Sequence, residues 1–287
     1  MKFVKMQAVG NDYIYISHDQ VIGQDIPGLA RNLSRRRFSV GSDGIIVVEK
    51  IDGKKIKMRI FNADGSEGAT RGNGVRCSAV FARKFLGVAE NEITVLTKSR
   101  ETKVTVLNSL PSFFGSQTKD VAYAKADMGS VFIGENGCNL CENLQKVGLY
   151  VDKSDIFRVN AGNEHLVFFT NFDLEKLSSA TYKSGLFKDG INVERVFSVQ
   201  KTDQNRFRLH AEIFERGSGK TLSCGSGAVA IAFAFAKKEN LLPCDSVFEV
   251  VTDGGSLFVT FTQNRAHLYG EVVEVYQGEL SPTRFKD

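Results

Sequence analysis

The sequence lacks several features that would assign a protein to the exported, membrane or nucleic-acid-binding classes. No apolar run approaches 18 residues, and the first residues, "MKFVKMQAVG", have no apolar core of a signal peptide. The net charge is only +4, and the densest basic run is "RRR" at 35–37. Such a short run is typical of a solvated helix end and does not indicate a nucleic-acid surface. We therefore expect a cytoplasmic protein without nucleic-acid or membrane partners.

Cysteine and proline are also scarce. The five cysteines are an odd number in a long chain without an export signal, which argues against a disulfide framework. Cys138 and Cys141 form a CxxC motif, but no second pair has the spacing of a structural zinc site. The preceding "GENG" indicates a turn, whereas a redox motif would follow a strand. We interpret the two cysteines as a surface or packing pair, and we expect no metal.

The sequence does contain an internal duplication. "ATRGNGVRCSAV" (69–80) and "TLSCGSGAVAIA" (221–232) both run from a Gly-x-Gly loop into an apolar, Ala-rich helix. The same separation of 153 positions aligns Ile60-Phe61 with Ile213-Phe214. With 42% hydrophobic and 24% charged residues, the composition is that of a globular protein. The duplication favours two domains over one large domain.

Each half is predicted to be mostly strand with one dominant helix. The helix of each repeat is apolar on most faces, as expected if strands wrap round it. Neither half shows the strand and helix alternation of a doubly wound sheet. Alternating apolar residues predict strands near 2–8, 13–17, 55–62, 103–107, 206–214, 246–251, 256–262 and 270–276. Helical spacing predicts helices near 28–36, 73–86, 173–182 and 226–239.

The start of each repeated helix is a candidate anion site. Free backbone N–H groups and the positive end of the helix dipole favour a carboxylate or phosphate there. The alternative is structural: Gly72, Gly74, Gly225 and Gly227 would only let the chain turn and pack closely.

Longer motifs resemble one known family. They include "MQAVGNDYIYI" (6–16), "GSDGIIVV" (41–48), "FNADGSEGATRGNGVRC" (61–77), "AGNEHLVFF" (161–169), "GINVE" (190–194), "ERGSGKTLSCGSGA" (215–228) and "YGEVVEVYQGEL" near the end. Together they span almost the whole chain, and they resemble the diaminopimelate epimerase family in their order. The resemblance implies an α+β fold with two pseudo-symmetric lobes, each a curled, mostly antiparallel or mixed sheet wrapped round a central helix. We assign the lobes to 1–119 with 277–287, and to 120–276.

The same resemblance implies a function. Members of this family interconvert L,L- and meso-diaminopimelate, in lysine and peptidoglycan biosynthesis, by α-proton transfer without pyridoxal phosphate. No metal or organic cofactor is implied, and the expected partners are a small diamino diacid and a second copy of the chain in a homodimer.

In the family, one cysteine from each lobe flanks the α-carbon, because inversion requires proton loss and gain on opposite faces. Cys224 stands at the second of these positions, and a thiol just before a helix is expected to have a lowered pKa. Arg71 stands at the first position. A guanidinium is always protonated and cannot serve as a general base. Cys77 matches a non-catalytic cysteine of the family, so we expect impaired epimerase activity.

The remaining family positions are retained. By motif, the substrate-binding residues would be Asn11, Asn62, Gly72, Asn73, Asn163, Asn192, Glu215, Arg216, Gly225 and Ser226. Arg216 could hold the distal carboxylate in a bidentate pair. Two positions depart from the family pattern: Glu164 replaces a proline, and Lys220 replaces an acidic residue. His165 could line the site.

Two alternatives stay open on the sequence. One is a racemase of another amino acid, or a one-base isomerase or lyase, in which Arg71 clamps a substrate carboxylate. The other is a disabled family member that binds an amino acid or a partner protein without turnover.

Overall fold

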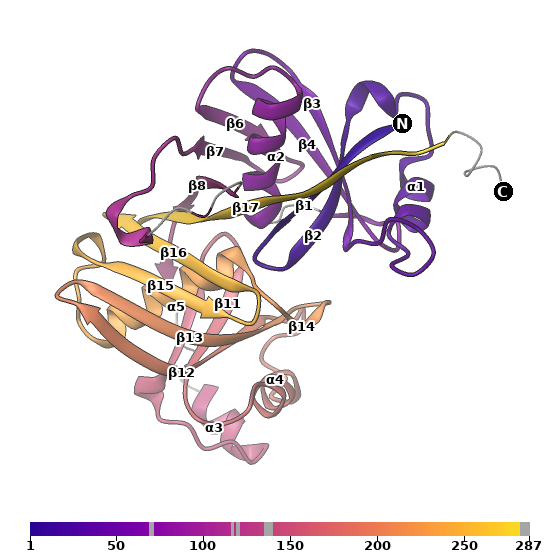
Figure 1. Ribbon diagram of the computed structural model, residues 1–287. Helices are drawn as coiled ribbons and strands as arrows, with labels where there is room; N and C mark the ends of the chain where they lie inside the picture. The colour runs from indigo at the N-terminus through magenta and orange to yellow at the C-terminus, as the bar shows by residue number, and fades with distance from the viewer. Residues whose placement is uncertain (69–71, 116–117, 119–120, 135–139, 282–287) are drawn as a thin grey trace. The chain divides into compact units, whose positions relative to one another are not determined.

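The computed structural model describes residues 1–68, 72–115, 118, 121–134 and 140–281 (Figure 1). The chain forms two compact units. Unit 1 is Met1–Asp127 with Tyr269–Asp287, and unit 2 is Met128–Leu268. Among the described residues, no helix is long and apolar enough to cross a membrane.

Unit 1 is a mixed sheet with two α-helices. Its strands are β1 (Lys2–Ala8), β2 (Asn11–Ser17), β3 (Gly44–Lys50), β4 (Lys55–Asn62), β5 (Glu67–Gly68), β6 (Glu92–Leu96) and β7 (Glu101–Val106). The chain passes between the units within β8 (Val121–Ser130) and β17 (Arg265–Glu279). The α-helices are α1 (Ile26–Leu33) and α2 (Gly72–Phe85), and short 3-10 turns cover His18–Gln20 and Ser112–Phe114.

Unit 2 repeats this order with one extra α-helix. Its strands are β9 (Phe132–Ile133), β10 (Ile156–Asn160), β11 (Glu164–Phe169), β12 (Asn192–Asp203), β13 (Arg206–Glu215), β14 (Gly219–Thr221), β15 (Val247–Thr252) and β16 (Gly255–Thr262). The α-helices are α3 (Leu140–Lys146), α4 (Leu174–Lys183) and α5 (Gly225–Lys238), with 3-10 turns at Lys153–Asp155 and Pro243–Asp245.

The strand pairing shows the duplication directly. In unit 1, β1 pairs antiparallel with β17 and with β2, and β2 pairs parallel with β3. Strand β3 pairs antiparallel with β4, which pairs antiparallel with β5 and parallel with β6. Strand β6 pairs antiparallel with β7. Strands β9 to β16 follow the same sequence of pairings and directions in unit 2. Two copies of one topology therefore make up the chain.

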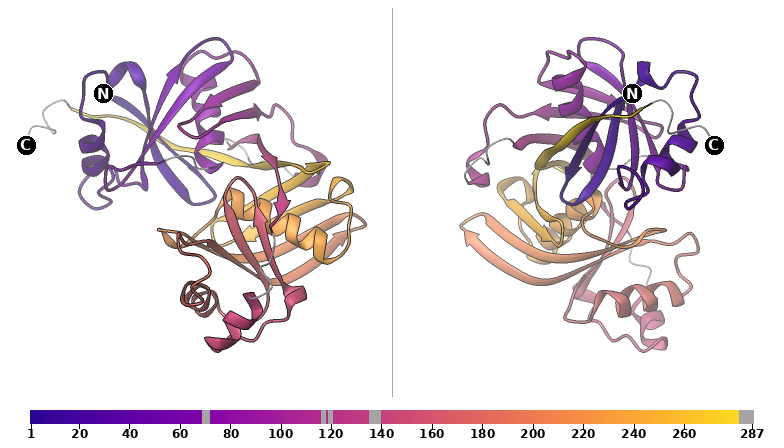
Figure 2. Two further views of the ribbon diagram at one scale, coloured as in Figure 1. Left: turned by 180° about the vertical axis from the view of Figure 1, so that it is seen from behind. Right: turned by 45° about the vertical axis from the view of Figure 1, so that its right-hand side comes forward.

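Each unit wraps its sheet round one helix. Helix α2 contacts β1, β2, β3, β4, β6 and β7, and α5 contacts the equivalent strands β10, β11, β12, β13, β15 and β16. Figure 2 shows the orange helix α5 lying against the strands of unit 2. Ten of the 14 residues of α2 and 11 of the 14 residues of α5 are buried, which explains their apolar composition. The predicted α+β fold of two pseudo-symmetric lobes is confirmed.

Glycine lets each central helix approach its sheet closely. A Cβ on Gly74 would lie 3.1 Å from Cδ1 of Ile46, and one on Gly227 would lie 3.0 Å from Oε1 of Glu194. These two glycines therefore have a packing role, whichever chemistry the loops before them serve.

An outer helix covers the other face of each sheet. Asp25 accepts a hydrogen bond from Gly28 N and begins α1, which packs Leu29 and Leu33 against Ile14 and Ile45. In unit 2, Asp173 accepts from Lys176 N and begins α4, whose apolar side belongs to one cluster with β10, β11 and β12. Strands β2, β3, β11 and β12 are therefore covered on both faces.

Every helix and strand predicted from periodicity has a counterpart, with ends that differ by a few residues. The patterns missed β3, β5, β6, β8, β9, β10, β11, β12, β14 and α3. Strands β3 ("GIIVVEK") and β11 ("EHLVFF") contain continuous apolar runs because both of their faces are buried, so they show no alternation.

Candidate active site

Cys224 occupies the N-cap position of α5. Its backbone is extended (φ −134°, ψ 123°), its carbonyl accepts from Ala228 N at 2.9 Å, and its Sγ lies 3.4 Å from Ser226 Oγ. The first N–H groups of a helix have no carbonyl partner within it. Gly225 and Ser226 thus present N–H groups beside the thiol, as a site for a carboxylate would require.

The thiol is not activated in the way that its position at a helix start suggests. Burial raises the pKa of Cys224 to about 12, and the Glu215 charge acts in the same direction. Hydrogen bonds from Ser226 and from Gly227 N lower this pKa, but by less. The expectation of a lowered pKa was therefore wrong for this conformation, because desolvation and acidic neighbours outweigh the helix dipole. Cys224 rests as a protonated thiol.

A buried carboxyl group, Glu194, and a buried imidazole, His165, lie next to the first turn of α5. His165 Nδ1 is 2.6 Å from Glu194 Oε1, and both side chains are fully buried. His165 Nε2 is 3.0 Å from Asn163 Oδ1. Because that oxygen only accepts, Nε2 is the ring nitrogen that donates, and Nδ1 is hydrogen-bonded to Glu194. Burial raises the pKa of Glu194, and its charge in turn helps to raise the pKa of Cys224.

Asn192 forms two hydrogen bonds within unit 2. Its Nδ2 donates to Glu164 O at 3.1 Å, and its Oδ1 accepts from Arg216 N at 2.9 Å. The side chain thus ties β11 and β12 to the residue after β13. Arg216 itself is exposed, and its Nη1 donates to Asp189 O at 3.3 Å, which leaves much of the guanidinium open to a ligand. Glu215, the last residue of β13, is half-buried.

Glu164 and Lys220, the two residues that depart from the family pattern, each form an ion pair within unit 2. Glu164 accepts from Arg158 Nε at 2.6 Å and from Asn160 Nδ2 at 2.7 Å, across the β10–β11 hairpin. Lys220 lies 2.7 Å from Glu212, which raises the pKa of Lys220. These residues therefore have structural partners of their own.

In unit 1, Asn11 has a fixed orientation. Its Nδ2 donates to Asp43 Oδ2 at 2.8 Å, and Asp43 Oδ1 accepts from Arg36 Nη2 at 2.8 Å. Arg36 also forms a bidentate salt bridge with Asp12, and Asp12 forms an ion pair with the buried Lys5. The network leaves the carbonyl oxygen of Asn11 as the atom that can accept from a ligand.

The other described candidates of unit 1 are Asn62, at the end of β4, and Gly72 and Asn73, at the start of α2. Asn62 Nδ2 donates to Ser66 Oγ at 3.0 Å, across the turn between β4 and β5. Gly72 begins α2, and the buried Asn73 accepts from Arg76 Nη2 at 3.0 Å. Arg71 lies outside the described residues.

Among the described cysteines, only Cys224 occupies the N-cap of an α-helix. Cys77 is buried inside α2, and burial raises its pKa to about 11. Cys141 is in α3, and Cys138 lies outside the described residues. Within the described part of the chain, no three His, Cys, Asp or Glu side chains could together hold a metal ion.

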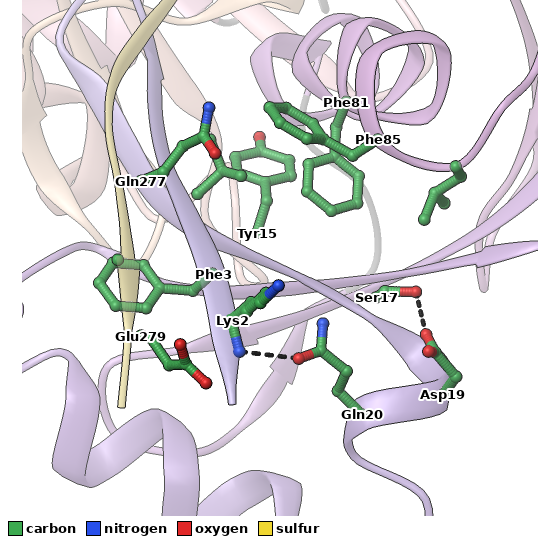
Figure 3. A pocket seen from close by; sticks show the side chains of 13 residues that line it. Lys2, Phe3, Tyr15, Ser17, Asp19, Gln20, Phe81, Phe85, Gln277 and Glu279 are labelled. Atoms are coloured by element: carbon green, nitrogen blue, oxygen red, sulfur yellow. Dashed lines mark hydrogen bonds between the residues drawn. The ribbon is translucent and has the colours of Figure 1, made fainter. Parts of the chain in front are cut away.

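Two cavities lie at the C-terminal ends of the central helices, one at α2 and one at α5. One, of about 510 Å³, is formed by β1, β2, β17 and the end of α2; Figure 3 shows the rings of Tyr15, Phe81 and Phe85 close together there. The other, of about 580 Å³, is lined by Lys238 and Glu239 at the end of α5. Neither contains a candidate residue. Five candidates lie instead at the helix starts, where N–H groups are available: Gly72 and Asn73 in α2, and Cys224, Gly225 and Ser226 in α5.

The comparisons agree with the motifs. Residues 3–114 and 157–281 match the family model of diaminopimelate epimerase. The chain belongs to the diaminopimelate epimerase family. It is 32% identical to the diaminopimelate epimerase of Desulfitobacterium hafniense, over 98% of both chains. It is 34% identical to that of Caldanaerobacter subterraneus subsp. tengcongensis, over 98% of this chain and 99% of that protein. The family is one of isomerases.

Solved structures of lower identity share the fold of this epimerase family member. A phenazine biosynthesis protein of the PhzF family from Bacillus anthracis is 15% identical with a TM-score of 0.68, over 98% of this chain and 99% of that chain. A hydroxyproline epimerase from Agrobacterium vitis is 13% identical with a TM-score of 0.60, over 98% of this chain and 90% of that chain. At this identity the likeness concerns the fold alone.

Sequence reasoning missed three side chains that the structure places beside candidates: Glu194, Asp43 and Arg76. Each stands inside a motif that resembles the family, but an acid or arginine in a strand or helix is most often a surface residue. Only the burial of Glu194 and Arg76, and the bond from Asn11 to Asp43, distinguish them.

Proposed function

We propose that this protein binds diaminopimelate and exchanges its α-proton, with Cys224 as the acid/base group, and that Arg71 leaves inversion much slower than exchange. The observation that supports the proposal best is the surroundings of Cys224. A buried thiol begins a helix, with an acid, a histidine and a retained set of polar residues in the same unit.

The acidic surroundings of Cys224 suit an ammonium ligand. Glu215 and Glu194 both raise the thiol pKa in the ligand-free protein. The α-ammonium of a bound amino acid would neutralise this field and so lower the pKa of the thiol. Deprotonation of Cys224 would therefore be coupled to substrate binding, and the thiol would stay protonated otherwise.

The start of α5 would stabilise the developing charge. When a base removes the α-proton, negative charge moves onto the carboxylate. N–H groups of a helix start hold that charge better than they hold the ground-state carboxylate. The proposed reaction consists of proton transfers at one carbon and needs no cofactor.

Arg71 would change the outcome of the reaction. A guanidinium does not return a proton at neutral pH, so protonation of the opposite face would depend on water. The proton that Cys224 removes would then return mainly from the same side, and hydrogen would exchange with solvent while the configuration is kept.

The polar residues suggest how a diamino diacid is recognised. Asn163 Oδ1 is bonded to His165, which leaves Nδ2 to donate to a carboxylate. The open face of Arg216 suits the distal carboxylate. Asn11 offers an oxygen to a distal ammonium.

The test is α-hydrogen exchange in D2O with a Cys224→Ser variant. With L,L- and meso-diaminopimelate supplied separately, we expect proton NMR to show exchange of the isomer whose α-hydrogen faces Cys224, and at least a hundredfold slower exchange by the variant, with similar affinity by calorimetry. A variant that exchanges as fast as the unaltered protein would exclude Cys224 as the base. Absence of diaminopimelate binding by both proteins would exclude the substrate.

A further inference from the structure

The cavity of about 580 Å³ in unit 2 has no part in the proposed function. It lies at the C-terminal end of α5, and residues of β11, β12 and β13 complete its lining. Cys224 stands at the other end of this 14-residue helix, a length of about 20 Å. Cavities of this volume commonly hold small molecules. This cavity is therefore a candidate binding site separate from that of Cys224.

Phenylalanine rings form the apolar wall of the cavity. Phe169, Phe207 and Phe235 line it, and the ring centroid of Phe235 is 5.2 Å from that of Phe207 and 6.2 Å from that of Phe169. Phe197 and Val199, which line it from β12, are 44% and 43% exposed. A concave surface that leaves large apolar side chains partly in water favours an apolar or aromatic ligand. A further ring could pack edge-on or offset among these three.

The charged residues of the lining include one cation and one anion that are not paired with each other or with a neighbour. Lys238 is already used, because its Nζ lies 2.6 Å from Asp155 Oδ1. Lys201 and Glu239 are exposed, and within the residues that the structure describes they form no ion pair. A ligand that carries both a carboxylate and an ammonium matches these two charges.

Strand β12 also offers backbone groups beside the cavity. Strand β11 pairs with β12 as far as Val196, whereas β13 pairs with it as far as Asp203. Among the described strands, none pairs with the β11 side of β12 beyond Val196. Backbone N–H and C=O groups on such an edge are free to bond a ligand. Ser198 and Val199 of this edge line the cavity.

We propose that this cavity is a binding site for an aromatic amino acid. The ring of the ligand packs among Phe169, Phe207 and Phe235. Its carboxylate pairs with Lys201, and its ammonium pairs with Glu239. None of these five residues belongs to the candidate active site, so the inference does not depend on the proposed function.

Val199→Trp tests the cavity, with Val275→Trp as the matched control. Both valines are about half exposed in strands, and Val275 in β17 lines neither cavity. Tryptophan suits strands and would fill the cavity from Val199. By calorimetry, L-phenylalanine at about millimolar concentrations should bind the unaltered protein and Val275→Trp. It should not bind Val199→Trp.

Two charge variants test the orientation of the ligand without filling the cavity. Lys201→Gln should weaken binding of L-phenylalanine and of 3-phenylpropionate about three- to fivefold, but not that of phenethylamine, which has no carboxylate. Glu239→Gln should weaken binding of L-phenylalanine and phenethylamine to a similar extent, but not that of 3-phenylpropionate. Both residues are exposed, so these variants should keep the urea midpoint of the unaltered protein. They decide the question if Val199→Trp does not fold.

Three results would overturn the inference. The first is no binding of L-phenylalanine to the unaltered protein at about 10 mM. The second is equal affinity in a folded Val199→Trp, which would place the amino acid elsewhere, such as at the Cys224 end of α5. The third is unchanged affinity for all three ligands in both charge variants. Each of these leaves the proposed function standing, because that function is tested by diaminopimelate exchange at Cys224.

Discussion

Alkylation of Cys224 as a function of pH distinguishes two opposite expectations for its thiol. A helix start alone would lower the thiol pKa, whereas burial and Glu215 raise it to about 12 from an ordinary 9.0. Only the thiolate reacts with iodoacetamide. At pH 8, the reactive fraction is about 1 in 10,000 at a pKa of 12, against about 1 in 10 at 9. The structure therefore predicts reaction about a thousandfold slower than that of an unperturbed thiol.

The assay follows the Cys224 peptide by mass spectrometry between pH 7 and pH 11. Because burial also slows access, the slope is the decisive quantity. We expect the rate to rise about tenfold per pH unit without a plateau. Glu215→Gln removes the charge that raises this pKa, and we expect it to react faster at each pH. A plateau below pH 9 would show a lowered pKa and refute the reasoning.

Further predictions follow from the same contacts. Stability should fall as the pH rises from about 9 toward 12, because the folded protein keeps protons on Cys224 that the unfolded chain has lost; urea midpoints measure this. Gly227→Ala should lower the free energy of unfolding by about 1–3 kcal/mol, because its Cβ meets the Glu194 carboxylate that His165 holds in place. Gly74→Ala should change it by less than about 1 kcal/mol, because its Cβ meets the flexible ends of Ile46 and Met58. Equal effects of the two variants would contradict this. Asp43→Ala should weaken diaminopimelate binding about tenfold by calorimetry, since it frees the Asn11 amide to rotate; unchanged affinity would exclude this positioning role.

The duplication and the wrapped helices were predictable because they follow from sequence periodicity. The separation of 153 positions between the Gly-x-Gly loops corresponds to two identical orders of strand pairing. Strands such as β3 were not predictable from alternation, because α1 and α2 bury both of their faces.

The electrostatics of the site were less predictable. The position of Cys224 at a helix start suggested a reactive thiol. Its pKa depends instead on burial and on Glu215 and Glu194, which lie in β13 and β12. Asn192 likewise is predicted to bind substrate, and the structure adds that its amide bonds Glu164 O and Arg216 N. Such partners come together only through strand pairing, which a single sequence does not specify.

The most direct measurement of the central claim is stereochemical. The unaltered protein and Arg71→Cys are each incubated in D2O with L,L- and meso-diaminopimelate, and proton NMR follows α-hydrogen loss while chiral chromatography follows inversion. We predict exchange that exceeds inversion in the unaltered protein, and inversion that rises to match exchange in Arg71→Cys. Inversion as fast as exchange in the unaltered protein would contradict the account, because another group would then supply the proton to the face opposite Cys224.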